Sequence, residues 1–191
     1  KNIKKLLGQP LCYYVLNALN LSSKIDDIYV STDCSEIEEV VSKLNFEKVK
    51  FFKRSSESST DGASSESAIL EFIKQKIDDH ETTFFFSQVT SPLLTVQDVD
   101  DALSQFDLND SDSLLSAVKY NRFFWSESGI PLNYNPLERP RRQDMENYFV
   151  ENGAIYISKV KSIIESNSRI SGKISIFPMS YNSLIEIDEE E

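Results

Sequence analysis

Apolar positions in the first 118 residues repeat alternately at the spacing of a helix and at that of a strand. Helical stripes follow Pro10, a capping-box pair at Ser35 and Glu38, and Thr95, which suits a helix N-cap. The pattern predicts helices that begin near residues 10, 35, 64 and 95, alternating with strands over residues 27–31, 49–52, 83–86 and 113–118. Strands separated by helices are typical of right-handed crossovers, so we expect an α/β fold with a mostly parallel sheet.

The regular pattern breaks over residues 119–150, a segment that contains three prolines and the sole tryptophan, Trp125. This segment (the arm) is too long and too irregular for an ordinary loop, which indicates an insertion with a task of its own. After the arm, the sequence predicts a strand over residues 153–157, a helix over 159–165 and a strand over 174–177. We therefore expect one domain over residues 1–191 that carries the arm.

Size and charge limit the possible functions. The chain has 191 residues and a mass of 21.8 kDa, which is enough for a single buried core. Its 31 acidic residues outnumber its 20 lysines and arginines, so we expect no nucleic-acid partner, because such binding depends on basic side chains. No apolar run approaches the roughly 20 residues that span a bilayer, which argues against a membrane protein. With only two cysteines, we expect a cytoplasmic protein, or a nuclear one in an animal cell.

Scarce residue types exclude several classes of enzyme. His80 is the only histidine and lies in a polar stretch, so we expect an exposed loop residue and no histidine-based zinc site. The five glycines are too far apart to form a P-loop or the glycine-rich turn of a dinucleotide-binding fold. Classical dinucleotide-dependent dehydrogenases and P-loop kinases are therefore excluded.

Polar segments follow the predicted strands at their carboxyl ends, where ligands bind in sheets of this kind. These segments are residues 31–33, 53–54 and 88–91. Elsewhere, three arginines lie within four positions of the arm, at Arg139, Arg141 and Arg142. Concentrated arginine suits bidentate recognition of a carboxylate or phosphate, and the alternative is a solvated loop paired with neighbouring acids.

Two acidic residues near the end of the sequence are a candidate metal site. Glu186 and Asp188 alternate around Ile187, so on a strand both carboxylates face the same side. Two carboxylates in that arrangement suit magnesium beside a substrate phosphate. The alternative is a solvated tail, because the acidic run continues to residue 191.

Several segments, taken in order, resemble the motifs of one enzyme family. They are Lys1–Lys4, Val30–Asp33, Arg54–Glu57 with Asp61, Gln88–Leu93, Arg139–Asp144, Glu151–Tyr156 and Ile185–Asp188. Together they resemble the acylneuraminate cytidylyltransferases, the CMP-sialic acid synthetases, and residues 124–127 and 131–136 resemble the animal-type branch. The resemblance implies a Rossmann-like three-layer sandwich of the nucleotide-diphospho-sugar transferase-like kind. It also implies an enzyme that joins CTP to the anomeric hydroxyl of a sialic acid and releases pyrophosphate.

The resemblance also implies a homodimer, an Mg²⁺ ion and roles for individual residues. The arm would reach into a partner subunit, where Arg141 or Arg142 would hold the carboxylate of the sugar. Glu186 stands where the family usually has aspartate. The implied residues are Lys1, Asn2, Arg54, Ser59 and Thr60 for the nucleotide; Gln88, Arg141, Arg142, Asn152 and Tyr156 for the sugar; Glu186 and Asp188 for Mg²⁺; and Lys1, Arg141, Arg142 and Asp188 for catalysis.

Two other functions remain open from the sequence. An octulosonate cytidylyltransferase is one, although that group resembles Q-G-D-E-P where this chain has Gln88-Val89-Thr90-Ser91-Pro92. The other is a non-catalytic homologue that dimerises or binds a ligand. No first strand and no phosphate-binding loop precede Lys1. We expect roughly 10–20 further residues ahead of it in the working protein, ending in a βα turn that binds phosphate.

Overall fold

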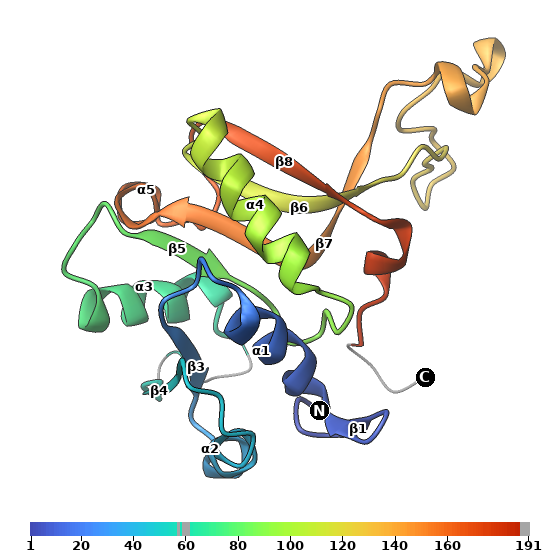
Figure 1. The fold of residues 1–191 in the computed structure, drawn as a ribbon. Coiled ribbons are helices and arrows are strands. Elements are labelled where there is room, and N and C mark those ends of the chain that lie inside the picture. Colours follow the sequence, from blue (N-terminus) through green and yellow to red (C-terminus); the bar gives the residue numbers. More distant parts are fainter. Residues whose placement is uncertain (57, 59–61, 188–191) are drawn as a thin grey trace.

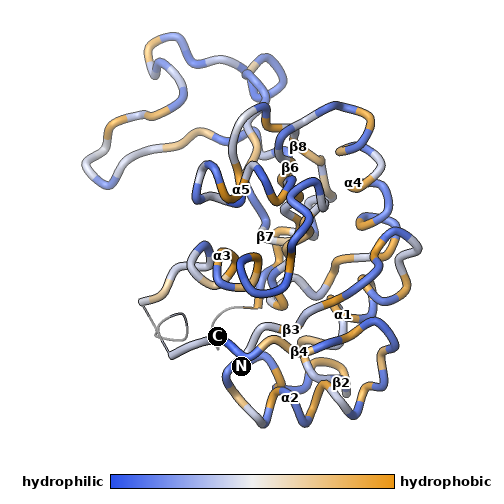
Figure 2. Tube along the Cα trace, turned by 90° about the vertical axis from the view of Figure 1, so that its left-hand side faces the viewer, coloured by the Kyte–Doolittle hydropathy of each residue, from blue (hydrophilic) through white to orange (hydrophobic). Residues whose placement is uncertain are grey.

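The main sheet lies between two layers of helices (Figures 1 and 2). The structure is a computed structural model and describes residues 1–56, 58 and 62–187. Four strands of the sheet pair in the order β5-β7-β6-β8. Their bounds are Thr83–Phe86 (β5), Ser113–Lys119 (β6), Phe149–Lys159 (β7) and Ile174–Met179 (β8).

Apolar side chains fill the space between the sheet and each helical layer. On one face, α1 (Leu11–Leu21) and α4 (Val96–Asn109) pack against strand residues such as Leu114 and Ile155, both fully buried. On the other, α3 (Ser65–Lys76) and α5 (Val160–Ser166) bury Ile73 and Ile163. Figure 2 shows the two pairs of helices on opposite sides of the sheet. None of the described helices combines the length and the apolar character needed to cross a bilayer.

A second, two-stranded sheet lies beside the first. Strands β3 (Ile28–Thr32) and β4 (Val49–Lys53) run parallel, and α2 (Ser35–Ser42) connects them. A short hairpin of β1 (Lys5–Leu6) and β2 (Gln9–Pro10) precedes α1. The carboxyl ends of β3 and β4 coincide, because Thr32 pairs with Lys53 at the last step of the ladder.

The α/β architecture expected from the sequence is confirmed, with a difference in the direction of one strand. Strands β3 and β4 are parallel, and so are β6 and β8. Strand β7 runs antiparallel to both of its neighbours, β5 and β6. The arm, rather than a crossover helix, connects β6 to β7, and a connection that returns at the same end of a sheet produces an antiparallel pair. The sheet is therefore mixed.

The predicted N-cap at Thr95 and the predicted capping box at Ser35 and Glu38 have different outcomes. At α4, Thr95 Oγ1 accepts the N–H of Asp98 (3.2 Å) and Asp98 Oδ2 accepts the N–H of Thr95 (3.0 Å), so this cap is confirmed. The capping box at Ser35 and Glu38 is wrong, because α2 already begins at Ser35 and its N-cap is Cys34. Thr32 Oγ1 accepts the Cys34 N–H (3.1 Å), which fixes the start of the helix one residue earlier than expected.

The arm projects away from the sheet (Figure 1). Two short 3₁₀ turns, Pro136–Glu138 and Arg142–Asp144, interrupt an otherwise irregular path. Within it, the guanidinium of Arg139 lies 4.1 Å from the ring centroid of Phe123 and 5.4 Å from that of Tyr134. Arg139 is therefore used to hold the arm together through cation–π contacts.

Candidate active site

A break in the pairing of the two central strands creates the candidate site. The β6–β7 ladder changes register between Leu115 and Ala117, so that β7 places several extra residues opposite Ser116. Ser116 Oγ accepts the N–H of Ile155 (2.8 Å) and donates to Asn152 Oδ1 (2.6 Å). The serine hydroxyl thus forms the hydrogen bonds that these polar groups do not receive from the interrupted ladder. The bulge also changes the direction of β7.

Gly153 lies in this bulge and brings two polar side chains together. Its φ of +66° is a left-handed conformation that favours glycine. A Cβ atom at this position would collide with Gln88 Oε1 and lie 2.8 Å from Glu186 Oε1. The Gly153 carbonyl also accepts the N–H of Gln88 (3.4 Å). Absence of a side chain at residue 153 therefore lets Gln88 and Glu186 converge on one point.

Asn152 holds the segment that carries Glu186. Its side chain is 1% exposed, and Nδ2 donates to Ser183 Oγ (2.8 Å) and approaches Met179 Sδ (3.2 Å). Ser183 belongs to the 3₁₀ turn η3 (Tyr181–Leu184), which directly precedes Ile185 and Glu186. The sugar-binding role that the resemblance implied for Asn152 is not supported by this position, because both ends of its amide are occupied inside the core.

Three of the motif segments meet beside this bulge. Ile187 donates its N–H to the Thr90 carbonyl (3.0 Å), and Ser91 Oγ donates to the Asn152 carbonyl (3.4 Å). These bonds join the residues after β5, the middle of β7 and the segment after η3. The structure therefore brings together Gln88, Tyr156 and Glu186, whereas the other implied metal ligand, Asp188, lies outside the described residues.

Tyr156 lies in the same region with its hydroxyl engaged. Tyr156 Oη donates to Glu151 Oε2 (3.0 Å), and the side chain is almost fully buried. Burial, followed by the hydrogen bond and charge of Glu151, raises the pKa of Tyr156 to about 12. The nearby Glu186 carboxylate acts in the same direction. Tyr156 is therefore a neutral hydroxyl at physiological pH.

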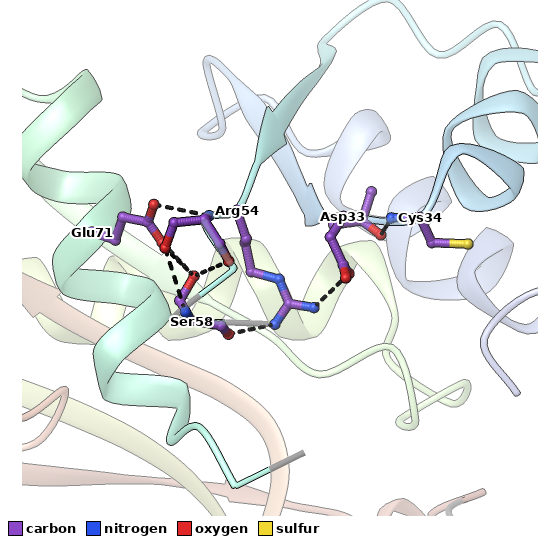
Figure 3. Close-up of polar contacts among 7 residues, drawn as sticks. Asp33, Cys34, Arg54, Ser58 and Glu71 are labelled. Carbon is purple, nitrogen blue, oxygen red and sulfur yellow. Dashed lines mark hydrogen bonds and ion pairs between the residues drawn. The ribbon is translucent and has the colours of Figure 1, made fainter. Parts of the chain in front are cut away.

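A second group of polar residues lies at the carboxyl ends of β3 and β4, as the sequence predicted. Arg54 follows β4, and its Nη2 forms an ion pair with Asp33 Oδ1 (3.3 Å), which follows β3 (Figure 3). Arg54 Nη1 donates to the carbonyl of Ser58 (3.4 Å). The Nε–H is shielded from water and has no acceptor among the described residues. This guanidinium is therefore held in place through its two terminal nitrogens.

Glu71 on α3 anchors the loop that follows Arg54, and the sequence reasoning missed it. Its carboxylate accepts hydrogen bonds from Ser58 Oγ and from the Ser55 N–H (3.0 Å), as Figure 3 shows for Ser58. The Ser58 bond lowers the pKa of Glu71, so the carboxylate stays ionised. Ser59 and Thr60, the predicted nucleotide ligands in this loop, lie outside the described residues.

The first residues of the chain lie against the start of α1. The Asn2 carbonyl accepts the N–H of Cys12 (3.0 Å), which ties this segment to the helix. Asn2 Oδ1 is shielded from water and has no donor among the described residues. Lys1 is exposed. Both positions are compatible with a ligand, and their predicted nucleotide roles stay predictions.

The arginines of the arm do not meet the other sugar-site residues within the chain. Arg141 is largely exposed and pairs with Asp144 through Nε–Oδ2 (2.6 Å). Arg142 is exposed and makes no hydrogen bond or ion pair within the described ranges. Both lie at or beside the second 3₁₀ turn of the arm, which projects from the body of the molecule (Figure 1).

The oxygen atoms above Gly153 suit a magnesium ion. Gln88 Oε1 and Glu186 Oε1 approach one point, and Mg²⁺ prefers oxygen ligands, with one or two carboxylates beside water and phosphate. No group of three or more His, Cys, Asp or Glu side chains within residues 1–56, 58 and 62–187 is placed to enclose a metal. A single described carboxylate, that of Glu186, leaves most ligand positions of an ion to water and phosphate, an arrangement that Mg²⁺ accepts.

The chain is similar to known proteins in sequence and in fold. The sequence model of the family described as cytidylyltransferase matches residues 1–189. N-acylneuraminate cytidylyltransferases A and B of Danio rerio are 35% and 36% identical to the chain, each over 98% of it and 44% of the relative. An N-acylneuraminate cytidylyltransferase of Streptococcus agalactiae serotype III is 27% identical over the whole chain and 47% of the relative. The chain thus spans less than half the length of these relatives.

Two solved structures share the fold. One is CMP:2-keto-3-deoxy-manno-octonic acid synthetase in complex with CTP, with a TM-score of 0.66, 15% identity and coverage of 94% of this chain and 83% of that one. The other is 4-diphosphocytidyl-2C-methyl-D-erythritol synthase of Anaerococcus prevotii, with a TM-score of 0.69, 12% identity and coverage of 96% and 82%. The nucleotide-diphospho-sugar transferase-like fold is therefore confirmed.

Replacing Gly153 should show how tightly the bulge is packed. We predict that Gly153→Ala lowers the free energy of unfolding by at least about 1 kcal/mol more than Gly129→Ala does. Both glycines have positive φ, but a Cβ at Gly129 meets nothing within 4 Å, so this control isolates the collision with Gln88 and Glu186. Urea unfolding of both variants measures the difference, and equal losses would contradict the prediction.

The raised pKa of Tyr156 should be visible in the pH dependence of stability. Between about pH 10 and 12 the unfolded state loses the Tyr156 proton while the folded state keeps it, so the free energy of unfolding falls as pH rises. We predict that Tyr156→Phe makes this fall shallower, and that Tyr181→Phe, at an exposed tyrosine, does not. Denaturant unfolding at pH 8 and pH 11 tests this; an equal slope for Tyr156→Phe and the parent protein would refute it.

Proposed function

The chain belongs to the cytidylyltransferase family, and from this premise we propose that it transfers CMP from CTP to a nonulosonic (sialic) acid and releases pyrophosphate. The observation that carries the proposal is the convergence of Gln88, Tyr156 and Glu186 around the bulge at Gly153. These residues come from three separate motif segments. Relatives named N-acylneuraminate cytidylyltransferase over nearly the whole chain support the choice of an acidic nine-carbon sugar.

The reaction requires positioning more than it requires a strong acid or base. The oxygen of the anomeric hydroxyl attacks the α-phosphorus of CTP, the bond to the β-phosphate oxygen breaks, and the hydroxyl proton passes to solvent or a nearby base. Arg54 holds the nucleotide side through the donor that its contacts with Asp33 and Ser58 leave available. Gln88 and Tyr156 hold the sugar on the neighbouring sheet.

Negative charge is the main obstacle in this site. CTP and the sugar are both anions, and the chain itself carries a net charge of −11. We propose that Glu186, with Asp188, holds a Mg²⁺ ion and that Lys1 adds positive charge near the phosphates. A bound ion would supply positive charge to the phosphates and to the pyrophosphate leaving group. The longer carboxylate of Glu186 reaches over Gly153 because residue 153 has no side chain in the way.

We propose that the arm completes the sugar site of a second subunit. Arg142 is exposed and makes no hydrogen bond or ion pair with the described part of the chain, and the arm projects from the domain. Exposed apolar side chains accompany it, among them Trp125, Leu132 and Leu137. A homodimer would bury these side chains and bring Arg141 or Arg142 to the carboxylate of the neighbour's sugar.

A turnover assay tests the proposed function. With CTP, Mg²⁺ and N-acetylneuraminate, we predict release of pyrophosphate and formation of the CMP-sugar, followed by mass spectrometry. Glu186→Gln should lower turnover at limiting Mg²⁺ by at least about tenfold, because it removes a charge that balances the ion, whereas Glu165→Gln, at an exposed position of α5, should not. Turnover of sugar-1-phosphates or of an octulosonate in place of nonulosonates would refute the assignment.

The homodimer has an independent test. We predict that an Arg141→Ala/Arg142→Ala variant and an Asp188→Asn variant are each nearly inactive. After verified subunit exchange, mixing them should restore part of the activity, because a hybrid dimer contains one site with both sets of residues. A monomer by light scattering, or no recovery in the mixture, would show that the arm does not serve a partner's site.

A further inference from the structure

Arg169 lies over an aromatic surface at the edge of the candidate sugar site. Its guanidinium carbon is 4.6 Å from the ring centroid of Tyr156 and 5.2 Å from that of Phe86. These two rings belong to directly paired residues of β7 and β5, so they share one face of the sheet. The arginine therefore lies beside the residue that the proposed function places against the sugar.

The guanidinium is held in place from two sides. Its Nε forms an ion pair with Glu66 Oε1 (3.3 Å), in the first turn of α3. The backbone of Arg169 is fixed as well, because Ser158 Oγ donates to its carbonyl (2.6 Å). Contacts with the two rings restrict the plane of the guanidinium further. Such a fixed group is suited to recognition, since little side-chain freedom is lost when a ligand binds.

One hydrogen-bond donor of this fixed group has no acceptor. Nη1 of Arg169 is shielded from water, and no described residue accepts its hydrogens. A guanidinium N–H without an acceptor is unfavourable in a shielded position, and a ligand oxygen would remove that cost. The neighbouring Tyr156 hydroxyl donates its proton to Glu151 and is not bonded to this nitrogen. About a fifth of the arginine side chain, at atoms other than Nη1, remains exposed, so the guanidinium lies next to a surface that a ligand can reach.

We propose that Arg169 is a substrate-binding residue that donates to an oxygen of the nonulosonate from within the same subunit. The proposal rests on the proposed function, because it deepens the description of the same sugar site. It assigns Arg169 to the sugar rather than to the nucleotide, since Arg169 contacts the Tyr156 ring while Arg54 lies on the other sheet. Arg169 acts in addition to the arginines of the arm and does not require the partner subunit.

The test compares steady-state constants of Arg169→Leu and Arg169→Lys with those of the parent protein. We expect the KM for N-acetylneuraminate to rise at least tenfold in both, which corresponds to about 1.4 kcal/mol, while the KM for CTP stays within twofold. Leucine keeps apolar bulk over the rings and lysine keeps the charge, but neither presents the planar fork. If Arg169 had a purely structural role, the KM for N-acetylneuraminate and the KM for CTP would change together.

Lys50→Leu is a matched control. Lys50 also lies over an aromatic ring, that of Tyr29 (5.7 Å), and is paired with a carboxylate, Asp27 (2.6 Å), but it lies on β4. We expect neither KM to change in this variant.

A second sugar identifies the oxygen that Arg169 binds. The comparison is between N-acetylneuraminate and the nonulosonate that has a hydroxyl at carbon 5 in place of the acylamino group. A smaller effect of Arg169→Leu on the KM for the second sugar points to the acyl carbonyl, and an equal effect points to the carboxylate or another shared oxygen.

Direct binding separates failure of this inference from failure of the proposed function. Calorimetric titration of N-acetylneuraminate should show weaker binding to both Arg169 variants than to the parent protein. Thermal unfolding checks that each variant is folded. If Arg169→Leu does not fold, the result for Arg169→Lys tests the proposal. Normal turnover and binding in the Arg169 variants would overturn the role of Arg169 and leave the proposed function intact. Absence of nonulosonate binding and turnover in the parent protein would overturn both.

Discussion

The hydroxyl of Ser116 is the contact on which the rest of the site depends. Where the β6–β7 ladder breaks, it accepts the Ile155 N–H and donates to Asn152, so the bulge leaves these buried polar groups satisfied. Asn152 in turn holds η3, which places Glu186, and Gly153 gives Gln88 and Glu186 the space to converge. A side chain at residue 153 would lie where those two oxygen atoms approach each other.

Fixed positive groups in this acidic chain are each held by a carboxylate or an aromatic ring. Arg54 is paired with Asp33, Arg169 with Glu66 and two rings, and Arg139 with the rings of the arm. The ion pairs of Arg54 and Arg169 lower the local net charge, yet each of these two guanidiniums keeps one nitrogen that has no acceptor within residues 1–56, 58 and 62–187. The site therefore attracts anions through a few oriented donors, while the overall charge of the molecule opposes them.

Much of the fold was predictable from the sequence because its helices and strands follow local apolar periods, and the polar segments after β3, β4 and β5 follow from strand direction. The site was less predictable. Five positions separate Glu151 from Tyr156, which places them on opposite faces of a regular strand, and only the bulge allows their hydrogen bond. Arg169 lies in the irregular segment after α5, where no period indicates which way a side chain faces. Asn152 matched a motif, but the motif did not show that its amide points into the core.

The antiparallel placement of β7 determines when the site can form as the chain folds. Ser87 contacts the Ala154 carbonyl across 67 positions of sequence, whereas β3 and β4 are joined through one short helix. Distant pairings form slowly because a long loop must close before any contact compensates for the lost chain entropy. During synthesis, the β3–β4 unit with Arg54 can therefore assemble while the segment that supplies Gly153, Tyr156 and Glu186 is still absent. The contacts that build the two halves of the site thus close chain loops of very different length, and the site is complete only once the long loop has closed.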